Sequence, residues 1–149
     1  MILYCDTSAL AKRYIDESGT KELTDLLSQS TQVFTSALTE LELFSFLERS
    51  KKISRISTPQ YRNINMMIEK DFQSNFLKTA TISKEIVSLA RRFIRQRFLR
   101  PADSIQLATA FFLSQKISES LLFCAADHHL LKAARMEGLK CEDFSLNEA

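Results

Sequence analysis

The chain has 149 residues, of which 45% are hydrophobic and 26% are charged, and its formal net charge is +2. This composition is typical of one globular domain, here expected over residues 1–149, and no apolar run approaches the roughly 20 residues that a membrane span needs. The N-terminus lacks the basic segment and cleavage site of a secretory signal, so we expect a cytoplasmic protein. The three cysteines show no CxxC-type spacing, and free thiols explain them better than disulfides or a zinc site.

The first element predicted is a short strand, Ile2–Cys5, whose apolar run is typical of a strand buried on both faces. It leads directly into Asp6, and Thr7 and Ser8 then open a helix. Asp6 is therefore expected at the carboxyl end of a central strand. In open α/β sheets this edge is where ligands bind.

Helices and strands alternate along the rest of the chain. Further strands are expected at residues 32–36, 75–81, 121–125 and 139–144. Helices are expected at residues 9–15, 21–27, 37–50, 59–72 and 84–98, from 101 onward, and from 127 to a stop at Gly138. This order predicts an α/β fold in which a parallel sheet carries helices on both faces.

The helix that follows Ser83 is strongly periodic. Its predicted buried face consists of Ile86, Leu89, Ala90, Phe93, Ile94 and Phe98. Residues 84–100 also hold six basic side chains against one acid, a local excess of +5. That excess is compatible with a polyanionic partner, although a solvated helix face explains it slightly better, since such faces are usually charged.

Few residues can support the familiar catalytic chemistries. The sequence has no glycine-rich nucleotide motif and no HExxH motif. The only histidines, His128 and His129, are adjacent, so on a helix they point about 100° apart and make a poor metal pair. We expect ordinary surface or half-buried roles for both, and without a Ser-His-Asp set a serine hydrolase is disfavoured.

Acidic residues are the remaining candidates. Asp6 and Asp127 each follow a predicted strand, Asp103 lies near a helix start, and the helix after the second strand supplies Glu40 and Glu42. If the first and fourth strands are neighbours, Asp6 and Asp127 share one edge. Carboxylates that meet there repel one another unless a cation neutralises them, and oxygen-only clusters select Mg²⁺ or Mn²⁺. Such a metal can activate water against a phosphodiester.

Each of these acids also has an ordinary structural explanation. Aspartate is a favoured helix cap, which suits Asp6, Asp103 and Asp127, and Asp103 with Gln106 fits a capping box. A glutamate on a long helix more often faces solvent. The spacing alone does not choose between Glu40 and Glu42.

Four segments are recognisable when they are taken together. They are LYCDTSAL at 3–10, TSALTELE at 35–42, ADSIQLATA at 102–110 and LFCAADHHLLKAARMEG at 122–138. Each is weak alone, but their order and spacing over nearly the whole chain are specific. The chain resembles PIN-domain ribonucleases, most closely the VapC-type toxins of type II toxin–antitoxin systems.

The resemblance implies a five-stranded parallel sheet and a Mg²⁺- or Mn²⁺-dependent endoribonuclease. It also implies that Asp6, Glu42 rather than Glu40, Asp103 and Asp127 are the catalytic, metal-binding acids, with Thr7 and Ser8 in support. One departure is Ala125, which stands where the family usually has a threonine. It motivates an alternative function, a PIN-like protein that binds RNA or a partner without cutting.

The resemblance further implies an RNA substrate, an antitoxin partner and a homodimer. Arg91, Arg92 and Arg95 would then guide the RNA backbone. In the resembling toxins the region that corresponds to residues 44–76 helps to form the antitoxin groove and the dimer. Met66, Met67 and Ile68 could serve there, although ordinary core packing is the better expectation.

Overall fold

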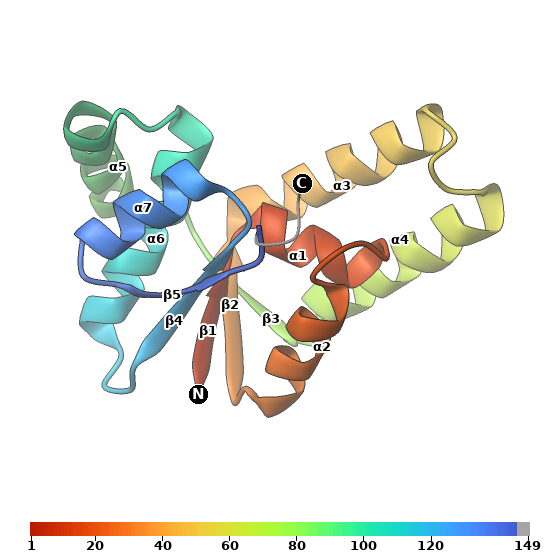
Figure 1. The fold of residues 1–149 in the computed structure, drawn as a ribbon, viewed down its shortest axis with the longest axis horizontal. Helices are drawn as coiled ribbons and strands as arrows, with labels where there is room; N and C mark the ends of the chain where they lie inside the picture. The colour runs from red at the N-terminus through yellow and green to blue at the C-terminus, as the bar shows by residue number, and fades with distance from the viewer. Residues whose placement is uncertain (146–149) are drawn as a thin grey trace.

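Five parallel strands form the centre of the molecule (Figure 1). The computed structural model describes residues 1–145. Within them the strands are β1 Ile2–Cys5, β2 Gln32–Ser36, β3 Leu77–Ala80, β4 Leu121–Ala125 and β5 Lys140–Asp143. Their order across the sheet is β3-β2-β1-β4-β5, so β1 is the central strand. The predicted α/β class, parallel sheet and number of strands are confirmed.

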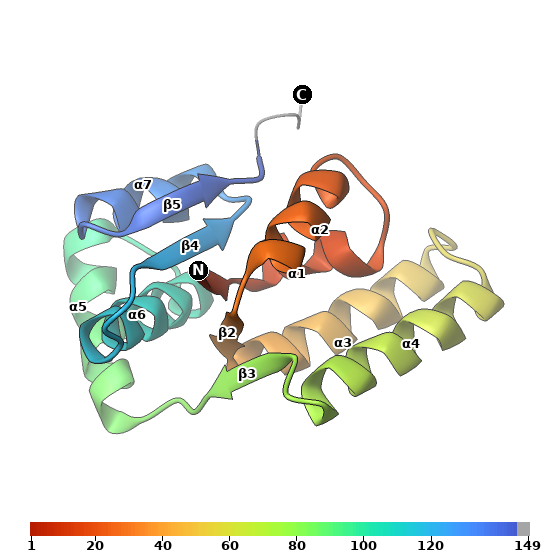
Figure 2. The same cartoon turned by 90° about the horizontal axis from the view of Figure 1, so that it is seen from below.

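Seven helices in the same residues cover the two faces of the sheet. They are α1 Thr7–Tyr14, α2 Thr20–Gln29, α3 Ala37–Lys52, α4 Thr58–Gln73, α5 Lys84–Arg97, α6 Pro101–Lys116 and α7 His128–Met136. Helices α1 to α4 pack on one face and α5 to α7 on the other (Figure 2). Residues of β1 alternate between the two cores, because successive side chains of a strand point to opposite faces: Leu3 and Cys5 enter one core, Ile2 and Tyr4 the other.

The sheet brings distant parts of the sequence to one edge. β1 pairs with β4 in a register that places Cys5 opposite Cys124. The amide of Asp6 then donates to the carbonyl of Cys124 at 3.0 Å. Because all five strands run in the same direction, α1, α3 and α7 begin at the same edge, where β1, β2 and β4 end (Figure 1). The expected neighbourhood of Asp6 and Asp127 is therefore confirmed.

Element boundaries differ from expectation by a few residues. The first helix begins at Thr7 rather than at residue 9 because Asp6 caps it. The weakly predicted strand at 75–81 shortens to β3, and the strand at 139–144 shortens to β5. Gly138 lies just after α7 with a positive φ of 88°, as a helix stop requires.

Two predictions of buried apolar side chains were wrong in part. On α5, Ile86, Ala90 and Phe93 are buried, but Ile94 is 37% exposed and Phe98 is 83% exposed. The helix ends at Arg97, and the left-handed backbone of Phe98 turns its side chain away from the buried face. 

Of the three α4 residues considered above, only Ile68 joins the core, whereas Met66 is 68% exposed and Met67 is 36% exposed. Three consecutive helical residues point about 100° apart, so they cannot all face the same core.

Cysteines and histidines occupy the places that the sequence indicated. Cys5 and Cys124 are buried free thiols, and Cys141 on the edge strand is half-buried and also free. His128 and His129 are both exposed. Within residues 1–145, none of the helices combines the length and the apolar character that crossing a bilayer would demand.

Candidate acidic site at the carboxyl edge of the sheet

Asp6 is the buried centre of the candidate site. Its side chain is almost inaccessible, with the residue 4% exposed. The carboxylate accepts hydrogen bonds from the backbone amide of Ala9 at 2.9 Å and from the hydroxyl of Ser8 at 2.8 and 2.9 Å. Asp6 therefore does cap α1, yet capping accounts for only part of its environment.

The pKa of Asp6 is raised from its ordinary value of 3.8 to about 7. Burial is the largest cause, because a buried carboxylate loses its hydration. The bonds from Ala9 and Ser8 oppose the rise in pKa, while the negative charges of Asp103 and Asp127 add to it. Three acids predicted to meet at this edge are thus close enough to influence one another electrostatically.

Asp103 is free of the capping role that the sequence allowed. Pro101 occupies the first position of α6 and Arg100 is the N-cap, so Asp103 is the third helical residue. The capping-box prediction with Gln106 was therefore wrong. Burial raises the pKa of Asp103, and the charges of Asp127 and Glu42 raise it further, although Arg100 at 3.5 Å lowers it. Asp103 is thus coupled to the acids of three other elements.

Glu42 points into the site, and Glu40 does not. Glu40 is exposed on α3, whereas Glu42 is half-buried and its Oε1 accepts a hydrogen bond from the Thr7 hydroxyl at 2.7 Å. The side-chain amide of Gln106 also approaches Oε1 of Glu42, at 3.4 Å. The structure thus places Glu42, and not Glu40, beside Thr7 and Gln106 near the other acids.

A buried polar network behind Glu42 was missed by the sequence analysis. Tyr4 is fully buried and its hydroxyl donates to Oε1 of Gln106 at 2.7 Å. This orients the amide so that its nitrogen donates to the Thr39 hydroxyl at 2.9 Å and faces Glu42. Gln106 is three residues after Asp103, and Thr39 is three before Glu42, so helical spacing was the available signal.

Thr7 and Ser8 support the acids instead of capping the helix, because Asp6 itself is the cap. Besides donating to Asp6, the Ser8 hydroxyl accepts from the amide of Ala126 at 2.9 Å. Ser8 therefore ties Asp6 to the end of β4. Ala125, the position that departs from the family pattern, is a fully buried residue of that strand, and its methyl side chain contributes only apolar packing there.

Asp127 caps α7 by accepting from the amide of Leu130 at 2.8 Å, and this bond uses only Oδ1. Among residues 1–145, no donor reaches Oδ2 of Asp127 or Oε2 of Glu42, and the carboxylate of Asp103 accepts only from Arg100, through Oδ2. Three acids thus each retain a carboxylate oxygen without a hydrogen bond. In the same residues no three His, Cys, Asp or Glu side chains are already gathered closely enough to hold a metal ion. The donor set nevertheless fits a hard cation, since it consists of carboxylates alone.

Arginines of α5 line a separate hollow of about 390 Å³, whose lining includes Arg91, Arg92 and Arg95. Arg92 is partly neutralised by Glu137, 3.6 Å away. Arg91 and Arg95 are exposed and form no ion pair with the described residues. All three arginines singled out from the sequence are therefore open to solvent, and two of them have no ion-pair partner among the described residues.

Comparison with known proteins identifies the family and the fold. The PIN domain family model matches residues 3–136. A solved structure of FitAcB from Neisseria gonorrhoeae has a TM-score of 0.67 at 16% identity, over 98% of this chain and 99% of that one. VapBC2 from Rickettsia felis, bound to a DNA fragment from its promoter, has a TM-score of 0.65 at 17% identity, over 97% and 99%.

A toxin–antitoxin complex from Klebsiella pneumoniae is also similar, with a TM-score of 0.52 at 20% identity, over 82% of this chain and 84% of that one. At such identities the likeness concerns the fold. No curated protein matches the sequence.

Proposed function

Because the chain belongs to the PIN domain family, we propose that it is a metal-dependent endoribonuclease that hydrolyses RNA phosphodiester bonds at the acidic edge of its sheet. PIN domains are in general nucleases. The observation that carries the proposal is the electrostatic coupling of Asp6, Asp103, Asp127 and Glu42 from four separate elements. Capping alone would not require these acids to meet.

Asp6, Glu42, Asp103 and Asp127 would hold Mg²⁺ or Mn²⁺ as the catalytic acids. The ion would lower the pKa of a water and offset the charge that develops on the phosphodiester. Thr7 and Gln106 fix Oε1 of Glu42, which leaves Oε2 available as a ligand. Ser8 and the amide of Ala9 likewise fix the carboxylate of Asp6. The protein's part is therefore to hold oxygens in place before the cation arrives.

Binding of the substrate would use the positive charge of α5. Arg91 and Arg95 are exposed, and Arg92 lies in the same hollow, so phosphates can approach them without breaking a buried contact. Contacts of this kind are independent of sequence and weaken as salt rises.

We also propose a cytoplasmic toxin that forms a homodimer and is held by an antitoxin protein. The support is the likeness in fold to the toxin–antitoxin complex from Klebsiella pneumoniae. Exposed apolar side chains on α3 and α4, among them Leu41 at 70% and Met66 at 68%, would be available to such partners.

Cleavage of a structured RNA pool by the purified protein tests the proposal. We expect cuts with Mg²⁺ or Mn²⁺, none with EDTA, and none from a folded Asp6→Asn variant. Full activity of Asp6→Asn would refute the site, and cutting unaffected by EDTA would refute the role of the metal. If the folded protein cuts nothing yet binds RNA, the alternative of a binding protein is favoured.

A further inference from the structure

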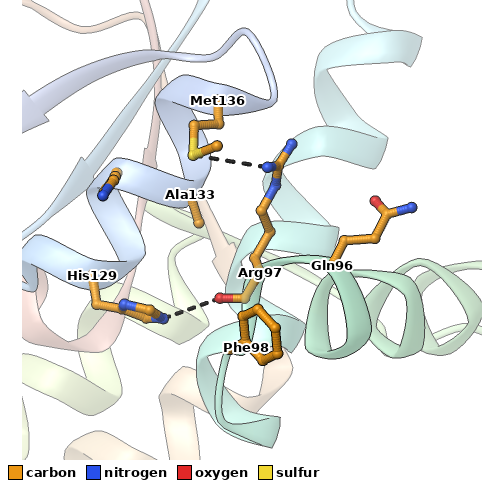
Figure 3. A pocket seen from close by; sticks show the side chains of 7 residues that line it. Gln96, Arg97, Phe98, His129, Ala133 and Met136 are labelled. Carbon is orange, nitrogen blue, oxygen red and sulfur yellow. Dashed lines mark hydrogen bonds between the residues drawn. The ribbon is translucent and has the colours of Figure 1, made fainter.

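A second hollow, of about 270 Å³, lies between the end of α5 and the outer side of α7 (Figure 3). Its walls include Gln96, Arg97 and Phe98 from the α5 side and His129, Lys132 and Met136 from α7. None of these residues takes part in the acidic site. The hollow therefore needs an explanation of its own.

Phe98 is the unusual residue of this hollow. Its ring is the most exposed large apolar side chain among the described residues, at 83%. Its backbone is left-handed, with φ 58° and ψ 34°, where its amide caps α5 through the carbonyl of Ile94 at 3.0 Å. Glycine is the usual residue at such a helix end, because a side chain is strained there. A strained, bulky and solvated residue is an outlier that points to function.

Both walls of the hollow belong to segments that also carry acids of the candidate site. Phe98 is five residues before Asp103, joined to it by the short turn that starts α6. His129 is two residues after Asp127 on the first turn of α7. Gln96 lines both this hollow and the arginine hollow of α5. The hollow of Phe98 is thus continuous with the arginine hollow through Gln96, and its two walls are joined along the chain to Asp103 and Asp127.

The walls are held by contacts that leave the ring itself uncovered. The imidazole Nε2 of His129 lies 3.2 Å from the carbonyl of Arg97, and the guanidinium of Arg97 approaches the sulfur of Met136 at 3.8 Å, as Figure 3 shows. Arg97 also pairs with Glu137 at 2.9 Å. Lys132 is exposed and forms no ion pair within residues 1–145. The flat apolar ring of Phe98 beside the exposed ammonium group of Lys132 suits a ligand that carries both an aromatic ring and a negative charge.

We propose that this hollow is a stacking site for a nucleobase of single-stranded RNA, with Phe98 as the platform and Lys132 near the adjoining phosphate. The proposal rests on the ribonuclease function proposed above and adds a substrate contact outside the acidic site, on a strand that would run from the acids over Phe98 toward Arg95 and Arg91. An aromatic platform in a positively charged track is the combination that binds single strands. Phe98 would then be a positioning residue, which fixes where the strand lies relative to the acids.

Binding of a fluorescein-labelled 12-nucleotide RNA of mixed sequence, followed by anisotropy in EDTA, tests this site. We expect Phe98→Ala to weaken binding about tenfold, since removing one stacking aromatic has effects of that order, and Phe98→Tyr to restore it. The matched control is Ile82→Ala, which shortens another exposed apolar side chain, just before α5, and is expected to change nothing. Because Phe98 is solvated, its variants are expected to keep the thermal midpoint of the wild-type protein.

An abasic strand of the same length separates stacking from charge. Wild type and Phe98→Ala are expected to bind that strand equally, and with the same salt dependence. Equal binding of the mixed RNA by wild type and Phe98→Ala would overturn the stacking site and favour a protein partner for the hollow. A defect of Phe98→Ala that persists on the abasic strand would overturn it as well.

These results are independent of the test of the proposed function. Metal-dependent cleavage that disappears in Asp6→Asn would stand even if Phe98→Ala bound RNA normally. Absence of both cleavage and RNA binding in the wild-type protein would refute the function and the stacking site together.

Discussion

Replacing Asp6 by asparagine is expected to stabilise the protein at alkaline pH while abolishing its activity. The Asp6 carboxylate is 4% exposed, and its pKa is raised to about 7, mainly because burial removes its hydration. Its ionised form is therefore unfavourable in the folded state when no cation is bound. Asparagine has nearly the same shape and can still accept the hydrogen bond from Ala9, but it carries no charge.

The size of the effect follows from the difference in pKa. The pKa of Asp6 is about 7 in the folded protein and 3.8 as the ordinary value, and each pKa unit corresponds to about 1.4 kcal/mol. The ionised carboxylate of Asp6 therefore lowers the free energy of unfolding by ~4 kcal/mol. Asparagine also turns an amide hydrogen toward one of its neighbours, which offsets part of the gain from removing the charge. The expected increase in the free energy of unfolding is therefore about 2–4 kcal/mol at pH 8.

The upward direction of the pKa shift determines the pH range over which Asp6 changes the stability. Between about pH 4 and pH 7 the folded state holds the Asp6 proton and the unfolded chain has lost it, so the contribution of Asp6 to stability falls as pH rises. Above about pH 7 both states are ionised and the penalty is constant. The advantage of Asp6→Asn over the wild type should therefore shrink to less than half at pH 5.

Urea unfolding in EDTA at pH 8 and pH 5 measures this difference. Glu40→Gln is the control, because it removes one negative charge from the exposed side of α3 without touching the site. Added Mg²⁺ is expected to stabilise the wild type and to leave Asp6→Asn unchanged, since binding to the folded state alone raises stability. An Asp6→Asn variant less stable than the wild type at pH 8 in EDTA would refute the reasoning.

Three further changes have defined outcomes. Tyr4→Phe leaves Oε1 of Gln106 buried without its donor, so urea unfolding should show a loss of about 1–3 kcal/mol, and an unchanged stability would contradict the network. Gly138→Ala should destabilise by about 1 kcal/mol in the same assay, because φ is 88° while nothing lies within 4 Å of an added Cβ, so a larger loss would mean a hidden clash. Joint replacement of Arg91 and Arg95 by glutamine should flatten the slope of log affinity against log salt by about 1.4 for single-stranded RNA, and an unchanged slope would remove these arginines from the binding surface.

The sheet was readable from the sequence because its strands are short apolar runs bounded by polar residues. β1, β2 and β4 have the predicted limits, since each is buried on both faces and is followed directly by a helix start. The edge strands β3 and β5 were predicted too long. A strand at the edge of a sheet has fewer neighbours, so its sequence is less constrained to alternate apolar and polar residues, and its ends are harder to predict.

The acids were predicted, but their exact surroundings were not. Pro101 was the signal that α6 starts before Asp103, and the capping-box pattern competed with it. The orientation of Gln106 depends on Tyr4, which is distant in sequence and reaches it only through the packing of α6 on β1. Local spacing cannot reveal such a contact, because tertiary packing decides it.

For Phe98 the local sequence pattern predicted the wrong environment. Helical periodicity assigned it to the buried face of α5, since its spacing from Ile94 is that of one helical turn. The helix ends at Arg97, and a phenylalanine in the left-handed conformation is not expected from sequence preferences. A residue that breaks a local rule in this way is where function is to be looked for.

Binding of Mn²⁺, followed by electron paramagnetic resonance, tests most directly whether the acids form one metal site. Glu42→Gln and Glu40→Gln make a matched pair, because both remove one charge from α3 and only Glu42 faces the site. We expect the wild type and Glu40→Gln to bind Mn²⁺ alike, and Glu42→Gln and Asp6→Asn to bind it at least about tenfold more weakly. Equal Mn²⁺ affinity of Glu42→Gln and Glu40→Gln would contradict the account.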